Sequence, residues 1–167
     1  MNQQIICACV FSLALAGTAA AQTKTSGTLS CEKPDPAYSV ETGDSAGHTL
    51  GLMKVACKWT KPMEIDGVAT KDGADVFTTD TRGTKSRTSG YFSGSMANGD
   101  KIFVRFSGTS TTTKDGKPET NGGSWSYAGG TGKFKGITGK GTYKDKLDAS
   151  GNPLTEVEGD YTLPAKK

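Results

Sequence analysis

The chain has 167 residues and a net charge of +3, from 20 lysines and arginines against 17 aspartates and glutamates. These charges are scattered, so the chain lacks the clustered basic patch that nucleic-acid binding needs. Its 23 glycines disfavour long helices, and its single histidine leaves too few ligands for a zinc site. We therefore expect no nucleic-acid partner, no metal and no cofactor.

The first residues have the features of an export signal. An apolar core from Ile5 to Ala16 is followed by small residues that end in Ala19-Ala20-Ala21, an A-x-A cleavage pattern. The apolar run is about 12 residues long, shorter than the roughly 20 needed to span a bilayer. We expect residues 1–21 to be a cleaved signal peptide and residues 22–167 to be one exported domain, periplasmic or secreted, without a membrane span.

Two cysteines, Cys31 and Cys57, remain after this segment is removed. Two cysteines in an oxidising compartment most economically form one disulfide. A metal pair or a reactive thiol is the alternative, but two cysteines without a nearby histidine make a poor metal site. We therefore predict a Cys31–Cys57 disulfide.

The rest of the chain predicts strands and turns. No window of eleven or more residues keeps apolar residues at helical spacing, whereas short alternating segments recur. Asn98-Gly99 lies between two of them, which is the strongest short-range signal for a hairpin. Further turns are predicted at 114–118 and 148–153. The predicted strands are Ser26–Cys31, Ala37–Thr42, His48–Trp59, Ala74–Thr81, Ser86–Met96, Lys101–Thr113, Ser124–Ala128, Ile137–Tyr143 and Leu154–Leu163.

A glycine-rich stretch runs from Thr120 to Lys144, with eight glycines in 25 residues and aromatic residues spaced between them. Glycine in a strand pattern marks a bulge, a barrel corner or a close backbone approach. A flexible linker is the alternative, but linkers do not carry phased aromatic residues. We predict two strands joined by a glycine corner, with Phe134 packed into the bend.

The segment from Tyr127 to Tyr143, YAGGTGKFKGITGKGTY, resembles the GGTGxFxGxxGxG segment of the allene oxide cyclase and dirigent barrel superfamily, and small secreted bacterial proteins of unknown role look similar there. The resemblance covers about 25 residues and implies an eight-stranded barrel. Allene oxide cyclases isomerise an unstable fatty-acid epoxide inside the barrel, and dirigent proteins steer the coupling of phenoxy radicals. The oligomers of the plant relatives imply that a homo-oligomer, such as a trimer, is worth testing. The pocket residues of those families match no positions here, so the resemblance implies a fold and not an activity.

Eight or nine strands with hairpin turns and no helices predict a closed antiparallel β-barrel of about eight strands, with a β-sandwich as the alternative. Closure removes exposed sheet edges, and a barrel of this size can be filled by side chains or hold one small ligand. The strand faces predict this lumen: Met53, Val55, Trp59, Phe77, Ile102, Val104, Phe106, Tyr143, Val157 and Tyr161.

Catalytic patterns are few. The only histidine, His48, follows Gly47 in a polar segment, which favours a solvated turn residue over a general base. Glu156, Glu158 and Asp160 share one strand face and could shift one another's pKa, but a solvated outer face is favoured. We therefore predict no catalytic residue.

Three functions stay open. The first is a barrel that binds a small apolar molecule, the second a structural or interaction module of the cell envelope, and the third a cyclase- or isomerase-like enzyme. The first is favoured, and its expected ligand-binding residues are Met53, Trp59, Phe106, Trp125, Tyr143 and Tyr161.

Overall fold

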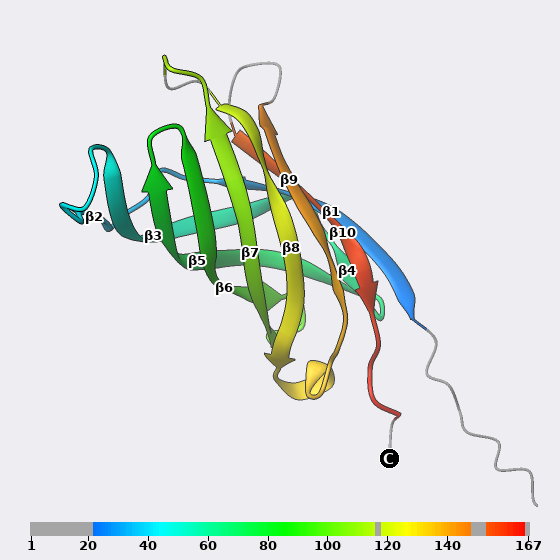
Figure 1. Cartoon of the computed structure of the whole chain (residues 1–167). Helices are drawn as coiled ribbons and strands as arrows, with labels where there is room; N and C mark the ends of the chain where they lie inside the picture. The colour runs from blue at the N-terminus through cyan, green and yellow to red at the C-terminus, as the bar shows by residue number, and fades with distance from the viewer. Residues whose placement is uncertain (1–21, 116–117, 148–152, 166–167) are drawn as a thin grey trace, which may run out of the picture.

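The computed structural model describes residues 22–115, 118–147 and 153–165, and within these residues the protein is a β-barrel (Figure 1). The predicted signal peptide, most of the turn at 148–153 and the centre of the turn at 114–118 lie outside the described residues. The strands are β1 (Thr23–Cys31), β2 (Ala37–Glu41), β3 (His48–Lys61), β4 (Glu64–Ile65), β5 (Val68–Arg82), β6 (Lys85–Met96), β7 (Lys101–Thr112), β8 (Pro118–Gly130), β9 (Lys140–Leu147) and β10 (Pro153–Tyr161).

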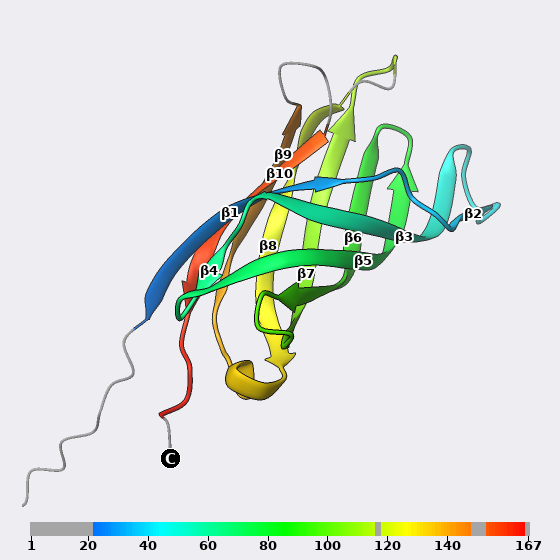
Figure 2. The ribbon, with the colours of Figure 1, turned by 180° about the vertical axis from the view of Figure 1, so that it is seen from behind.

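Eight of these strands close the barrel, and every pairing is antiparallel. The order runs β3-β1-β10-β9-β8-β7-β6-β5, and β5 pairs with β3 again to complete the circle. The last part of β3 pairs with β1 and a longer part with β5, so this strand crosses from one side of the closure to the other (Figure 2). The predicted closed barrel is thus confirmed.

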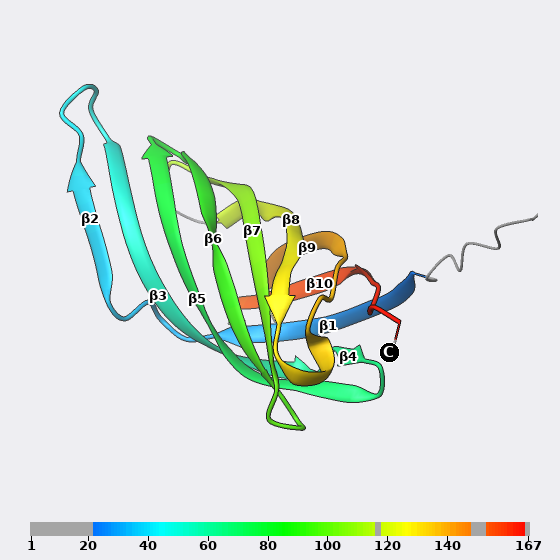
Figure 3. The same cartoon turned by 90° about the horizontal axis from the view of Figure 1, so that it is seen from below.

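The two short strands lie outside this circle. β2 pairs with the first part of β3 and continues the sheet beyond the barrel, where it splays away from β1 and β10 (Figure 3). All of its residues are exposed, including Tyr38 and Val40. In the described residues, no helix has the length and apolar character required to cross a membrane.

Most strand predictions hold to within a few residues, but one hairpin was missed. β4 and β5 are joined at Asp66-Gly67, where both residues have positive φ angles of 49° and 74°. Asp-Gly between Ile65 and Val68 is the sequence signal for such a turn. The hairpin could not be predicted from strand patterns, because β4 has only two residues and is too short to show alternation. The predicted Asn98-Gly99 hairpin between β6 and β7 is confirmed.

The glycine corner also forms as predicted, with one difference. The 3-10 helix η1 (Gly132–Phe134) lies between β8 and β9, and the side chain of its last residue, Phe134, is completely buried. The second strand begins at Lys140 and not at Ile137, because Gly139 has a φ of +142° that interrupts the extended backbone. Ile137 is nevertheless buried beside Phe134.

The interior contains two apolar clusters. The first closes the barrel end next to η1 and consists of Met63, Ile65, Met96, Ile102, Phe134, Ile137 and Tyr161. The second fills the middle of the barrel and consists of Leu29, Val55, Cys57, Phe92, Val104 and Trp125, with half-buried aromatic residues around it. The first cluster seals one end of the barrel, and the candidate site lies in the second.

Candidate functional site

A cavity of about 80 Å³ lies within the middle of the barrel. Each of the eight barrel strands contributes at least one side chain to its wall. The wall is mostly apolar and aromatic, with only Asp75 and Thr155 adding strongly polar groups. The lining residues are Leu29, Trp59, Met63, Asp75, Phe92, Val104, Phe106, Trp125, Tyr143, Thr155 and Val157.

Aromatic rings form much of this wall and contact one another edge to face. The ring centroids of Trp59 and Phe92 are 6.3 Å apart, and those of Phe106 and Tyr143 are 6.0 Å apart, both with interplanar angles of 83°. This is a favoured arrangement of aromatic pairs, in which the edge of one ring meets the face of the other. These ring contacts therefore hold the aromatic side chains of the cavity wall in place.

Glycines on neighbouring strands provide the space for these rings. A Cβ on Gly141 would lie 2.7 Å from the Trp125 indole, and one on Gly159 would lie 2.5 Å from it. Gly27 likewise makes room for Trp59. The glycines of the barrel strands thus allow large rings to lie flat against backbone, as the glycine-rich sequence suggested.

The two indole groups differ in their hydrogen bonding. Trp125 Nε1 donates to the carbonyl oxygens of Thr142 and Glu158, both at 3.2 Å. Trp59 Nε1 is buried, and the described residues offer it no acceptor. A buried donor without a partner costs free energy, which a ligand with an acceptor atom would recover.

The carboxyl group of Asp75 is the acidic group in the cavity wall. Burial, followed by the nearby carboxyl of Asp145, raises its pKa from an ordinary value of 3.8 to about 7. Its Oδ2 lies 3.6 Å from Cys57 Sγ. This contact is not a hydrogen bond, because Cys57 is disulfide-bonded and its sulfur carries no proton.

Asp145 lies on β9, and its carboxyl group accepts hydrogen bonds from neighbouring side chains. Burial raises its pKa, while hydrogen bonds from Thr155 (Oγ1–Oδ1 2.5 Å) and Asn121 act in the opposite direction. The pKa of Tyr143 is raised to about 12 by burial and then by the negative charges of Asp145 and Asp75. Both carboxyl groups therefore contribute negative charge near the same tyrosine in the lumen.

The structure brings four of the six expected ligand-binding residues into the cavity wall, namely Trp59, Phe106, Trp125 and Tyr143. Tyr161 instead belongs to the cluster beside η1, where its hydroxyl accepts a hydrogen bond from the Asp66 N–H at 2.8 Å. Met53 is half-buried and is not among the lining residues. That any of these residues binds a ligand stays a prediction.

The sequence analysis missed the two carboxyl groups. Asp75 lies two residues before Phe77, and Asp145 lies two residues after Tyr143, so strand alternation places each carboxyl on the same face as an aromatic residue already assigned to the lumen. The signal was therefore present, whereas the row that the sequence suggested for acid–base chemistry was Glu156, Glu158 and Asp160. In that row Glu156 and Glu158 are exposed as expected, whereas the Asp160 side chain is only 14% exposed.

The prediction for His48 is wrong. The side chain is buried, with 5% of the residue exposed, and its ring bridges two carboxylates. Nδ1 lies 2.5 Å from Asp44 Oδ1, and Nε2 lies 3.1 Å from Asp80 Oδ1. The polar segment before β3 folds over the ring, which could not be inferred from local composition. This cluster joins the β2–β3 loop to β5 and lies outside the cavity wall.

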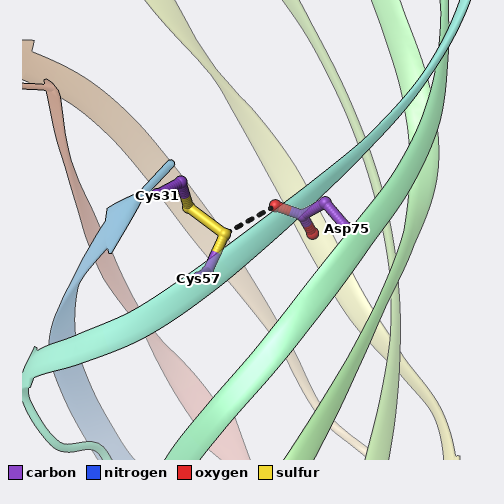
Figure 4. A group of neighbouring side chains, drawn as sticks. All are labelled: Cys31, Cys57 and Asp75. Carbon is purple, nitrogen blue, oxygen red and sulfur yellow. Dashed lines mark hydrogen bonds between the residues drawn. A yellow bond between two sulfur atoms is a disulfide. The ribbon is translucent and has the colours of Figure 1, made fainter. Parts of the chain in front are cut away.

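The predicted disulfide between Cys31 and Cys57 is present and joins β1 to β3 (Figure 4). Ligand atoms of these cysteines and of Asp75 lie within 4.8 Å of one another, which is close enough for a shared ion. A disulfide, however, leaves no thiolate to coordinate a metal. The disulfide thus serves to hold the two strands beside Asp75.

A larger groove of about 940 Å³ lies on the outside of the barrel, over β1, β9 and β10. It is open to solvent and lined by exposed charged residues such as Lys24, Lys61 and Lys140. Binding sites for small molecules are typically enclosed and mostly apolar with a few polar groups. We therefore take the smaller internal cavity as the candidate site.

No protein-family model and no curated protein matches the sequence. Solved structures do match: a pterocarpan synthase dirigent protein superposes with a TM-score of 0.50 and 15% identity, over 87% of this chain and 88% of that one. The fold is that of a dirigent-type barrel. A second pterocarpan synthase dirigent protein has a TM-score of 0.47 and 14% identity, over 88% of this chain and 97% of that one. A conserved protein of unknown function from Rhodopseudomonas palustris has a TM-score of 0.47 and 9% identity, over 84% and 98%. At these identities the dirigent-type barrel describes the fold and not the activity.

Proposed function

We propose that this dirigent-type barrel is an exported protein that encloses a small, largely apolar molecule in its lumen. The observation that carries the proposal is the cavity itself, which has aromatic walls from strands all around the barrel. Trp59 Nε1 and the Asp75 carboxyl supply polar groups that could orient such a molecule. The disulfide supports export, because disulfides persist in oxidising compartments.

The chain provides its own probe for this proposal. It contains only two tryptophans, Trp59 and Trp125, and both line the cavity. A molecule that enters the lumen should therefore change the intrinsic fluorescence of the protein. The experiment titrates a panel of small aromatic and aliphatic compounds and records the emission spectrum.

Two variants on β10 make the test specific. Val157→Phe places a phenyl ring in the cavity wall and should abolish the fluorescence response, whereas Glu156→Phe adds the same ring on the exposed outer face and should keep it. Both variants are first checked for cooperative unfolding. A response that survives Val157→Phe, or no response to any compound, contradicts the proposal.

A second candidate function is acid–base catalysis, such as isomerisation of an enclosed molecule. Asp75 favours it, because a carboxyl with a pKa of about 7 can both accept and donate a proton near neutral pH. Isomerisation preserves mass, so the protein would be incubated with a small-molecule extract and products of unchanged mass followed by chromatography. Asp75→Asn should abolish any such conversion. Conversion that continues in this variant contradicts a role for Asp75.

The expectation of a homo-oligomer stays a prediction for this protein. Light scattering on the purified protein tests it directly, since a monodisperse monomer contradicts it. The alternative of a structural module without a ligand would gain support from the failure of the fluorescence test.

A further inference from the structure

The charge of the lumen narrows the chemical class of its ligand. Every lysine and arginine whose exposure is described is exposed at the surface, so none of them lies in the cavity wall. Asp75, in contrast, lines the cavity, and among the described residues it forms no ion pair. A buried carboxylate without a positive partner is costly, and a positively charged ligand would remove that cost.

Of the groups around Asp75, the Asp145 carboxyl adds to the negative charge, whereas the Tyr143 hydroxyl is neutral at pH 8 because its pKa is raised to about 12. Asp145 and Tyr143 face it from β9, across the lumen, and Cys57 faces it from β3 but is held in the disulfide and does not titrate. The lysine and arginine side chains of β3 and β6, the two strands that pair with β5, are exposed, among them Lys54, Lys58 and Arg87. No titratable group on the neighbouring strands therefore offsets the charge of Asp75 among the described residues.

The aromatic walls favour the same kind of ligand. The faces of tryptophan, tyrosine and phenylalanine rings attract cations, and this attraction strengthens where water is excluded. Trp59, Phe106 and Tyr143 line the cavity together with Asp75. Aromatic rings with a carboxylate are the combination that recognises methylated ammonium groups.

The size of the cavity limits the group that enters it. Its volume of about 80 Å³ is roughly half that of an engineered cavity of 150 Å³ that binds benzene. It is therefore suited to a compact group rather than to a fused aromatic system. A trimethylammonium group is compact, apolar on its surface and positively charged.

We propose that the lumen binds a small organic cation, whose ammonium group lies against the Asp75 carboxylate and between the rings of Trp59, Phe106 and Tyr143. This inference rests on the proposed function, since it names the ligand class of the same cavity. It differs from that function in one respect: a neutral molecule of the same shape should bind much less tightly.

Two probes of matched shape test this difference by isothermal titration calorimetry. Choline carries a trimethylammonium group, and 3,3-dimethylbutan-1-ol has carbon in place of the nitrogen and no charge. At pH 8 we expect choline to bind at least tenfold more tightly than the alcohol. Equal or tighter binding of the alcohol overturns the inference and leaves the proposed function in place. Binding of neither probe also overturns the inference, and the proposed function then stands or falls with the fluorescence test on the wider panel.

A pH comparison on the unmodified protein gives a second, independent readout. Choline requires the ionised carboxylate, and a group with a pKa of about 7 is about 90% ionised at pH 8 and about 10% at pH 6. Choline affinity should thus fall about tenfold from pH 8 to pH 6, while alcohol affinity changes less than twofold. A choline affinity that is the same at both pH values overturns the inference.

Two variants test whether Asp75 causes the preference for choline. Asp75→Asn should remove the preference for choline over the alcohol and also its pH dependence. Asp72→Asn changes an exposed aspartate on the same strand and should leave both unchanged. A preference for choline that Asp75→Asn retains overturns the assignment of Asp75.

Discussion

Replacement of Asp75 by asparagine keeps the shape of the protonated side chain but removes its ability to ionise. In the folded protein the Asp75 pKa is raised from 3.8 to about 7. The folded state therefore keeps a proton that the unfolded state loses, and the free energy of unfolding falls as the pH rises from about 4 to 7. Below pH 4 the stabilising effect of the raised pKa is complete, and above pH 7 it is lost.

The magnitude follows from the same pKa values. At 1.36 kcal/mol for each pKa unit, the change is worth about 4 kcal/mol. Asp75 is only half-buried, so solvent reduces this figure, and we expect about 2–4 kcal/mol. Such a difference is a large part of the total stability of a domain, which is about 5–15 kcal/mol.

Urea unfolding followed by circular dichroism at pH 4, 6 and 8 measures this effect. Asp75→Asn should match the unmodified protein at pH 4 and be more stable by about 2–4 kcal/mol at pH 8. Asp72→Asn controls for the loss of an exposed charge on the same strand. Parallel stability curves for Asp75→Asn and the unmodified protein would refute the reasoning.

Three further predictions concern the scaffold, each measured by denaturant unfolding at pH 7. Reduction of the Cys31–Cys57 disulfide, whose cysteines are 26 residues apart, should lower the free energy of unfolding by about 3 kcal/mol; an unchanged midpoint in reductant contradicts this. Gly141→Ala should cost about 1–3 kcal/mol, because its Cβ would lie 1.9 Å from a carbonyl oxygen of β10, and a neutral effect would show that β9 can move. His48→Ala should cost about 1–3 kcal/mol, because it removes the contacts of the buried ring with Asp44 and Asp80 and leaves a space where the ring lay, and stability equal to the unmodified protein would refute the bridging role.

The barrel was predictable from sequence because its signals are local and repeated. Alternation identified most strands, and Asn98-Gly99 located a hairpin. The glycine corner was predicted with Phe134 in the bend, and Phe134 is fully buried there. Each of these features depends on residues that are close together in the chain, so no tertiary information was required.

The errors have a different origin. His48 was assigned to a solvated turn, but Asp80, 32 residues later in the chain, reaches its ring across the β3–β5 pairing. Asp75 and Asp145 became a pair only through barrel closure, which brings β5 and β9 to face the same lumen. Alternation within each strand places the two carboxyl groups in the lumen, but only the long-range register decides that they lie near each other.

The central claim is that the lumen holds a small molecule, and native mass spectrometry tests it most directly. The protein would be exported to an oxidising periplasm, purified gently and weighed before and after unfolding. Enclosure of a ligand predicts an added mass that is released on unfolding, absent from Val157→Phe and retained by Glu156→Phe. A protein that carries no added mass in any form, or an added mass that Val157→Phe retains, would contradict it.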